Sequence, residues 1–228
     1  MKISLIIPAC NEERRIGKTL EKAKQFKGVD EIVVVSNGSD RTAEITRSFG
    51  KKDRRIKLVD FKTPLGKGGA VIEGLKKARF NAIIYDADGS TPLSEIEKVK
   101  KKLDEGFDFV IGSRNLQSSK TKRSLAREIN SRFFSSLVRL VLSVPYRDTQ
   151  CGFKALNKKT AKLLAKKTTY KGWTWDLNAI LVAKKNNLKI IEIPVEWKHE
   201  STDNWRGFKK LQLLKMLYEL LEMKVNLN

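Results

Sequence analysis

Residues 81–92, NAIIYDADGSTP, contain two aspartates whose spacing suits a divalent cation, Asp86 and Asp88. Residues 82–85 form a short apolar run that predicts a buried strand, and positions i and i+2 of an extended segment point to the same side. Both carboxylates are therefore predicted to face one cleft, where their oxygens would suit Mg²⁺ or Mn²⁺ and substrate phosphates would complete the shell. Taken alone, the same spacing also fits solvated aspartates in a turn.

The elements that must position these aspartates alternate between strands and helices. Apolar runs predict strands at residues 3–8, 31–36, 55–60, 82–85 and 107–112, with amphipathic helices between them. Thr91 and Pro92 are predicted to be the N-cap and first residue of the helix after Asp88. Strands that alternate with helices indicate an α/β fold with a mostly parallel sheet flanked by helices, in a single compact domain.

Ligands of such sheets bind beyond the carboxyl ends of the strands. Three polar loops are predicted there, at residues 9–12, 37–40 and 86–90, and free N–H groups at residues 66–69 could meet a phosphate with Lys67. No G-x-G-x-x-G follows the first strand, which excludes a standard Rossmann cofactor site. Glu12 occupies the place of the first glycine of a P-loop, which excludes that motif too.

The 228 residues suffice for one large domain or two closely joined halves, predicted at 1–115 and 116–228. A net charge of +21 indicates an anionic partner, such as nucleic acid, an acidic membrane surface or phosphorylated substrates. Cys10 and Cys151 lack metal-site spacing, which favours a reducing, cytoplasmic setting. With no signal peptide and no transmembrane-length apolar stretch, any membrane contact is expected to be peripheral, on the inner face of the cell membrane.

Five motifs in order, IPACNEE, VVSNGSD, GKGGA, DADGSTP and GSR, resemble the family 2 glycosyltransferases of the GT-A fold. That resemblance implies an inverting enzyme that uses a nucleotide sugar. DTQCGFK (148–154) and WTWDLN (173–178) are similar to the dolichyl-phosphate β-glucosyltransferases and, less closely, to the dolichol-phosphate mannosyltransferases. The similarity extends to about Trp197.

The resemblance implies roles for the polar loops. Asp88 would be the main metal ligand, with Asp86 nearer the sugar or ribose. Ser36 and Asn37 replace two acids that the family usually has, and Asn37 can still hydrogen-bond a base edge. The predicted nucleotide-sugar-binding residues are Pro8, Ala9, Glu12, Asn37, Lys67, Asp86, Ala87 and Asp88.

Arginines in the second half are candidates for an acceptor phosphate, which guanidinium groups bind in a bidentate fork. Arg114 directly follows a strand end, and Arg123 and Arg127 lie four residues apart, which puts them on one helical face. The resemblance implies that this region, with Gln150, faces a lipid phosphate. Arg123 and Arg127 also fit ordinary solvated surface charge.

Asp176 stands where the family holds its candidate base. A phosphate monoester is mostly dianionic at neutral pH and needs no base, so Asp176 is expected to orient an arginine or the sugar. His199 is either a further metal ligand or a rim residue. The tail from Phe208 to Leu221 has leucines at helical spacing, which fits a helix lying on a bilayer or one packed on the sheet.

Together these features predict a metal-dependent hexosyltransferase that moves glucose or mannose from UDP-glucose or GDP-mannose to a polyprenyl phosphate at an anionic membrane surface. One alternative is transfer to a sugar hydroxyl. Another is a non-catalytic basic module that binds anionic lipid or nucleic acid, although no nucleic-acid-binding motif supports a nucleic-acid partner.

Overall fold

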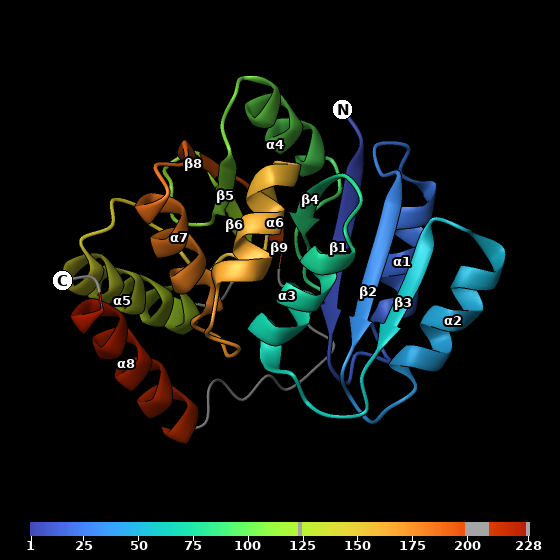
Figure 1. Cartoon of the computed structure of the whole chain (residues 1–228), viewed down its shortest axis with the longest axis horizontal. Helices are drawn as coiled ribbons and strands as arrows, with labels where there is room; N and C mark the ends of the chain where they lie inside the picture. The colour runs from blue at the N-terminus through green and yellow to red at the C-terminus, as the bar shows by residue number, and fades with distance from the viewer. Residues whose placement is uncertain (123–124, 199–209, 227–228) are drawn as a thin grey trace.

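The computed structural model describes residues 1–122, 125–198 and 210–226. Its strands and helices alternate through the first half and continue into the second (Figure 1). The strands are β1 (Ile3–Ala9), β2 (Glu31–Ser36), β3 (Ile56–Asp60), β4 (Asn81–Ile84), β5 (Phe109–Ser113), β6 (Lys120–Lys122), β7 (Lys154–Leu156), β8 (Ile190–Pro194) and β9 (Glu196–Lys198). The helices are α1 (Ile16–Gln25), α2 (Thr42–Lys52), α3 (Gly66–Lys77), α4 (Glu95–Asp104), α5 (Leu125–Leu142), α6 (Lys158–Lys167), α7 (Trp175–Lys185) and α8 (Lys210–Val225).

Seven strands form one sheet in the order β3-β2-β1-β4-β7-β5-β8, and β6 pairs with β9 in a small parallel sheet. The prediction of an α/β fold with a mostly parallel sheet is confirmed, and the one described strand of this sheet that departs from the parallel direction is β7, which runs antiparallel to both β4 and β5. The division at residue 115 stays a prediction. The sheet itself takes β7 and β8 from the second predicted half.

Both faces of the sheet are buried, which explains why the central strands are continuous apolar runs. Ile6 of β1 packs with α3, α5, α6 and α7, whereas Leu5 and Ile7 face the opposite layer, which α1 and α4 cover. This alternation is the period of two expected of a strand. The helices on both faces hold the strand ends, and the loops that follow them, in fixed positions.

The helix after the aspartates begins at Glu95, and not at Pro92 as the sequence predicts. The Thr91 carbonyl accepts the Tyr85 hydroxyl at 2.5 Å, and the Pro92 carbonyl accepts the Glu95 N–H at 3.0 Å. A turn therefore takes the place of the predicted first helical turn. Its effect is to tie the aspartate loop to the end of β4.

Helices α5 and α8 pack against each other beside the second half of the sheet (Figure 1). Within the described ranges, none of the helices combines the length and apolar character needed to cross a bilayer. The tail forms the predicted helix, which begins at Lys210.

Candidate active site

The two aspartates lie in a turn beyond β4, so the prediction that they continue an extended strand is wrong. Gly89, at φ 68°, donates its N–H to the Asp86 carbonyl at 3.1 Å and closes that turn. Thr19 of α1 donates its hydroxyl to the Ala87 carbonyl at 2.8 Å. Burial raises the pKa of Asp88. The charge of Asp86 raises it further, because the two aspartates remain close together.

Acidic groups gather around this turn. Glu12 lies within electrostatic reach of both aspartates. Burial raises the Glu12 pKa, and the charges of Asp88 and Asp86 raise it further. Arg15, which donates to the two carboxylate oxygens of Glu12 at 2.6 and 2.8 Å, lowers this pKa but does not outweigh the other causes. The buried Ser90 donates its N–H to Asp88 Oδ1 at 2.9 Å. Crowded carboxylates beside a buried hydroxyl are a donor set that a hard cation fits.

The described residues contain no ready group of three acidic, histidine or cysteine side chains for a metal.

A network of alternating charges surrounds Asp86. Lys67 at the start of α3 places its Nζ 3.3 Å from Asp86 Oδ1. Burial opposes the charge on Lys67, but Asp86 and then Asp176 outweigh it and raise the Lys67 pKa. Burial likewise opposes the charge on Asp86, while Lys67, Arg114 and Lys154 lower the Asp86 pKa.

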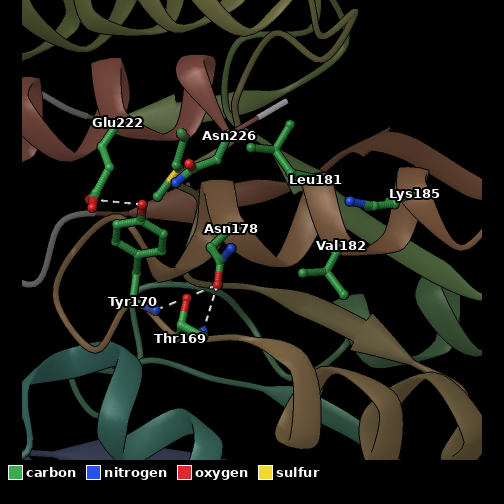
Figure 2. Close-up of a pocket in the computed structure, with 9 residues that line it drawn as sticks. Thr169, Tyr170, Asn178, Leu181, Val182, Lys185, Glu222 and Asn226 are labelled. Carbon is green, nitrogen blue, oxygen red and sulfur yellow. Dashed lines mark hydrogen bonds between the residues drawn. The ribbon is translucent and has the colours of Figure 1, made fainter. Parts of the chain in front are cut away.

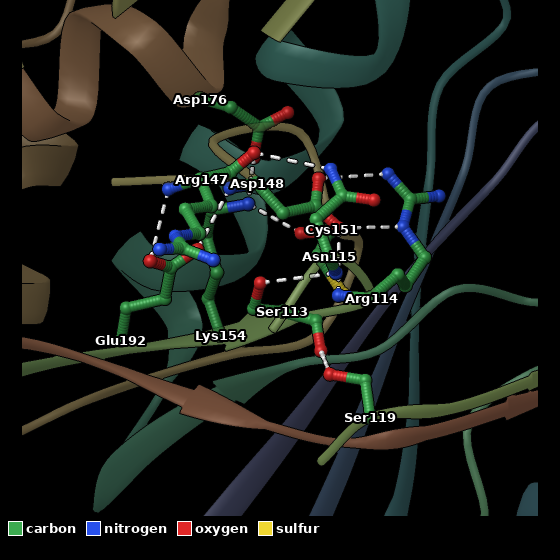
Figure 3. Close-up of polar contacts among 10 residues, drawn as sticks. All are labelled: Ser113, Arg114, Asn115, Ser119, Arg147, Asp148, Cys151, Lys154, Asp176 and Glu192. Atoms are coloured by element: carbon green, nitrogen blue, oxygen red, sulfur yellow. Dashed lines mark hydrogen bonds and ion pairs between the residues drawn. The ribbon is translucent and has the colours of Figure 1, made fainter. Parts of the chain in front are cut away.

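Arg114 is already paired in this network (Figure 3). Its Nε and Nη2 donate to the two carboxylate oxygens of Asp148 at 2.7 and 2.9 Å, and its guanidinium lies 5.6 Å from the Trp197 ring centroid. Glu192 of β8 fixes Asp148 in turn, because its Oε1 accepts the Asp148 N–H at 2.7 Å. The predicted phosphate-binding arginine is thus held rigidly, with its charge compensated.

Sequence reasoning missed Lys154, the first residue of β7. Its side chain is fully buried, with Nζ 2.7 Å from Asp176 Oδ1 and donating also to the Cys151 carbonyl. Asp176 is therefore oriented by a lysine rather than by one of the described arginines. The DTQCGFK stretch gave no signal for this, because its partner lies on another element.

Asp86 lies directly over the backbone of Gly152, which leaves no room for a side chain at that position. A Cβ at position 152 would stand 1.8 Å from Asp86 Oδ2. Cys151 beside it is buried, and burial followed by Asp148 raises its thiol pKa to about 11. The thiol is a packed group and not a nucleophile.

The prediction of free N–H groups at residues 66–69 is wrong for Gly68 and Gly69. Gly68 and Gly69 donate their N–H groups to the carbonyls of Gly172 and Lys171 at 3.1 and 3.0 Å. Lys67 instead extends over the Trp173 ring, 5.4 Å from its centroid. The same loop engages Gln150, whose Nε2 donates to the Trp173 carbonyl at 3.3 Å.

The first two strand ends form the other side of the site. Pro8 and Ala9 end β1, and the Ala9 carbonyl accepts the Asn37 N–H at 3.1 Å beyond β2. The Asn37 side chain is buried, and its Oδ1 lacks a hydrogen-bond partner in the described structure. An unpaired buried acceptor costs free energy unless a ligand supplies the donor.

Three predicted groups cannot be placed. Arg123, His199 and the side chain of Arg127 lie outside the described residues. The chain before His199 does reach the aspartate turn, because Lys198 at the end of β9 donates its N–H to the Ser90 carbonyl at 2.8 Å.

Residues 4–164 match the family model of glycosyl transferase family 2. The chain belongs to this family. Dolichyl-phosphate beta-glucosyltransferase ALG5A of Trichomonas vaginalis is 33% identical over 86% of this chain and 65% of its own length. Glycosyltransferase AglD of Haloferax volcanii is 31% identical over 86% of this chain and 33% of its own length. The chain thus spans under two thirds of these two relatives.

Among solved structures, the GT-A fold is shared with glucosyl-3-phosphoglycerate synthase of Mycobacterium tuberculosis, crystallised with Mn²⁺, UDP-glucose and phosphoglyceric acid. The TM-score is 0.69 at 19% identity, over 98% of this chain and 79% of that one. At this identity the similarity concerns the fold.

Proposed function

We propose that this family 2 glycosyltransferase transfers a hexose, with inversion, from a nucleotide diphosphate sugar to a polyprenyl phosphate. The observation that carries the proposal is the Asp86–Asp88 turn at the carboxyl end of β4, on the same edge of the sheet as the Asn37 acceptor that follows β2. The names of the dolichyl-phosphate β-glucosyltransferase relatives support the lipid phosphate and favour glucose over mannose.

The nucleotide would lie over the ends of β1 and β2. Asn37 Oδ1 would accept an imino N–H of the base, which uracil and guanine both offer, so UDP-glucose and GDP-mannose remain the two donors to compare. Pro8, Ala9 and Glu12 would line the base and ribose. The diphosphate would reach the aspartate turn, near Lys67 and Ala87.

Asp88, with Asp86, would hold Mg²⁺ or Mn²⁺. When bound, such a cation offsets negative charge on the departing diphosphate. The raised Asp88 pKa supports this assignment, since a cation offsets both the burial of the Asp88 carboxylate and its repulsion by Asp86. The Mn²⁺ complex of the mycobacterial neighbour agrees with it.

In the proposed step, an acceptor phosphate oxygen attacks the anomeric carbon on the face opposite the leaving group. The new carbon–oxygen bond forms as the bond to the nucleoside diphosphate breaks, so the configuration inverts and no covalent enzyme intermediate is needed. A dianionic phosphate attacks without losing a proton. Arg114, held by Asp148, would face the acceptor phosphate together with Gln150, Arg123 and Arg127.

The buried Lys154–Asp176 ion pair favours phosphate over a hydroxyl acceptor. A general base must be ready to take a proton, whereas Asp176 is neutralised by a lysine 2.7 Å away. Asp176 then acts by orienting the sugar or its neighbours. The alternative is transfer to a sugar hydroxyl, and the test must distinguish it from transfer to a lipid phosphate.

A membrane surface is the proposed place of action. Helix α8 presents five exposed apolar side chains at helical spacing on the side away from its buried Met216 and Leu220, and the whole chain carries a net charge of +21. Such a face with a basic protein suits an anionic leaflet. The exposed stripe consists of Leu211, Leu214, Tyr218, Leu221 and Val225. The free thiols Cys10 and Cys151 favour the cytoplasmic side.

The deciding experiment incubates the purified chain with UDP-glucose or GDP-mannose, Mg²⁺ or Mn²⁺, and a short polyprenyl phosphate, and analyses the products. Formation of a polyprenyl phosphate hexose with β-linked sugar from an α-linked donor is expected. Parallel arms offer a free sugar and a glycolipid hydroxyl. Transfer only in those arms, or no transfer from either donor, contradicts the proposal.

A further inference from the structure

The loop of residues 168–174, between α6 and α7, forms one wall of the candidate site. Its Lys171 and Gly172 carbonyls accept the N–H groups of Gly69 and Gly68 at the start of α3. Its Trp173 lies against Lys67, the partner of Asp86. The loop therefore controls where the first turn of α3, and Lys67 with it, can lie.

The other side of this loop is fastened to the C-terminal helix. The Thr174 hydroxyl, on a fully buried side chain, donates to Glu219 of α8. The Tyr170 hydroxyl donates to Glu222 Oε2 at 2.8 Å (Figure 2). Glu219 and Glu222 are three residues apart, so one face of α8 holds both ends of the loop segment 170–174.

These contacts bridge helices that do not close fully on each other. A pocket of about 450 Å³ opens between α7 and α8, lined in part by Asn178, Leu181 and Met223. Close packing is incomplete at this seam, so polar contacts carry the connection. Hydrogen bonds to a carboxylate are stronger than neutral ones, and that between Thr174 and Glu219 is shielded, since the Glu219 side chain is 12% exposed.

We infer that Glu219, assisted by Glu222, is a positioning residue of the active site that acts through Thr174 and the 168–174 loop. Helix α8 is then part of the catalytic apparatus, although it contributes no side chain to the reacting groups. Loss of the Thr174–Glu219 bond releases the loop, and the Gly68 and Gly69 amides lose their acceptors. Trp173 then no longer holds the Lys67 side chain in the position where it pairs with Asp86.

Hydrogen exchange of the Gly68 and Gly69 amides measures this connection directly. In the full chain, Thr174→Val and Glu219→Ala should each speed their exchange about tenfold, the effect of losing one hydrogen bond to a charged acceptor. Combining the two changes should add little, because they break the same bond. Glu219→Gln should behave like the unmodified chain, because its amide oxygen still accepts the hydroxyl. Thr46→Val, which removes another buried threonine hydroxyl on α2, is the matched control.

The inference is overturned if Thr174→Val and Glu219→Ala leave these two amides as protected as before. It is also overturned if Glu219→Ala speeds exchange throughout the chain, since that marks general destabilisation. Thr174→Val keeps the packing volume and decides the matter if Glu219→Ala does not fold.

Turnover is the second measurement, and it alone rests on the proposed function. Thr174→Val and Glu219→Ala should lower kcat about tenfold, in step with the loosened loop, with recovery in Glu219→Gln. Faster exchange with unchanged kcat would show that α8 holds the loop without serving the reaction. If the unmodified chain transfers no sugar, the proposed function fails, and the exchange rates still decide the connection.

Discussion

Asp88 is the residue on which the proposed reaction depends most. Burial and the nearby charge of Asp86 raise the pKa of its carboxyl group, and a bound cation would offset that repulsion. Asp88→Asn is expected to lower turnover by at least about two orders of magnitude, comparable to the loss of one preorganised electrostatic contact. Initial rates across a Mn²⁺ titration measure this, with the exposed Asp104→Asn on α4 as control. Full activity of the unmodified enzyme in EDTA would rule out the metal requirement.

Asp176 needs a test that separates chemistry from folding. Asp176→Asn leaves the Lys154 charge buried without its partner, so a loss of about 3 kcal/mol in stability is expected. Because the acceptor is proposed to be a phosphate, the pH profile of kcat in the folded variant should keep its basic limb. Loss of that limb would instead identify Asp176 as a general base.

A double variant provides the control. Lys154→Met with Asp176→Leu removes both charges and fills the same buried volume with apolar side chains. The stability of this variant should therefore exceed that of Asp176→Asn. Unfolding midpoints in urea measure the difference. A double variant that is less stable than Asp176→Asn alone would contradict the ion-pair account.

At the scale of elements, β7 matters because it brings Gly152 under Asp86. Gly152→Ala would place a Cβ 1.8 Å from Asp86 Oδ2, so the carboxylate must leave the position in which it pairs with Lys67 or the backbone must shift. Turnover is expected to fall at least about a hundredfold, as a misplaced group of this kind does. Gly17→Ala on α1 is the matched control, because its Cβ would meet only ordinary contacts at 3.8 Å and beyond. Equal rates for the two variants would contradict this assignment.

The opposite ends of the strands are tied together by Glu31. Its buried carboxylate accepts from Ser4 at 2.5 Å, Lys57 at 2.7 Å and Arg79 at 2.7 Å, which joins β1, β2, β3 and the start of β4. Burial opposes its charge, but these hydrogen bonds prevail and lower the Glu31 pKa to about 2.

A depressed carboxyl pKa stabilises the fold above the pKa of the unfolded chain, and this stabilisation is lost as the pH falls. Glu31→Gln should therefore lower the free energy of unfolding by about 2 kcal/mol at pH 7. The gap from the unmodified chain should shrink between pH 4.5 and about 2. Urea unfolding across this range measures it, with the exposed Glu97→Gln as control. A gap that is constant with pH would refute the linkage.

The sequence predicted the elements whose signals are local. The limits of β2 agree to the residue, because EIVVVS is buried on both faces and carries no competing pattern. Strand β7 has three residues and begins with a lysine, which gives no periodicity and argues against burial. The charge partner of the buried Lys154 is Asp176, which lies on a separate helix, and no spacing rule reveals that pairing.

The same limit applies to the site. The motifs drew attention to the loops after β1, β2 and β4, and the structure places these loops at one edge of the sheet because the three strands are parallel. The occupied N–H groups of Gly68 and Gly69 depend on a loop about a hundred residues away in sequence, and were therefore not predictable from residues 66–69. The role of Glu219 is hidden for the same reason.

For the whole molecule, the exposed stripe of α8 and the net charge predict binding to anionic vesicles. Each basic side chain near an anionic leaflet contributes about 1 kcal/mol, and salt screens that part. Replacing Leu211, Leu214 and Leu221 by serine should weaken partitioning at least about tenfold, because their apolar surface stays in water. Co-sedimentation at low and high salt measures both contributions.

Neutral vesicles and thermal unfolding are the controls for that experiment. The serine variant should melt close to the unmodified chain, since the stripe contacts solvent. Equal binding to neutral and anionic vesicles would remove the electrostatic part. Unchanged vesicle binding by the serine variant would show that α8 does not contact the membrane. If the unmodified chain self-associates and the serine variant does not, the exposed stripe instead contacts a second copy of the chain.

The insertion of β7 between β4 and β5 has a consequence for synthesis on the ribosome. Strand β4 ends at Ile84, yet its second neighbour in the sheet begins only at Lys154. At about 5–20 residues per second, the growing chain exposes the unpaired edge of β4 for several seconds. An open edge of this kind invites pairing with other chains. A nascent chain halted after β5 should therefore bind chaperones or self-associate, and one halted well past β8 should not. Equal behaviour of the two halted chains would show that the edge is protected earlier than its partner strand is made.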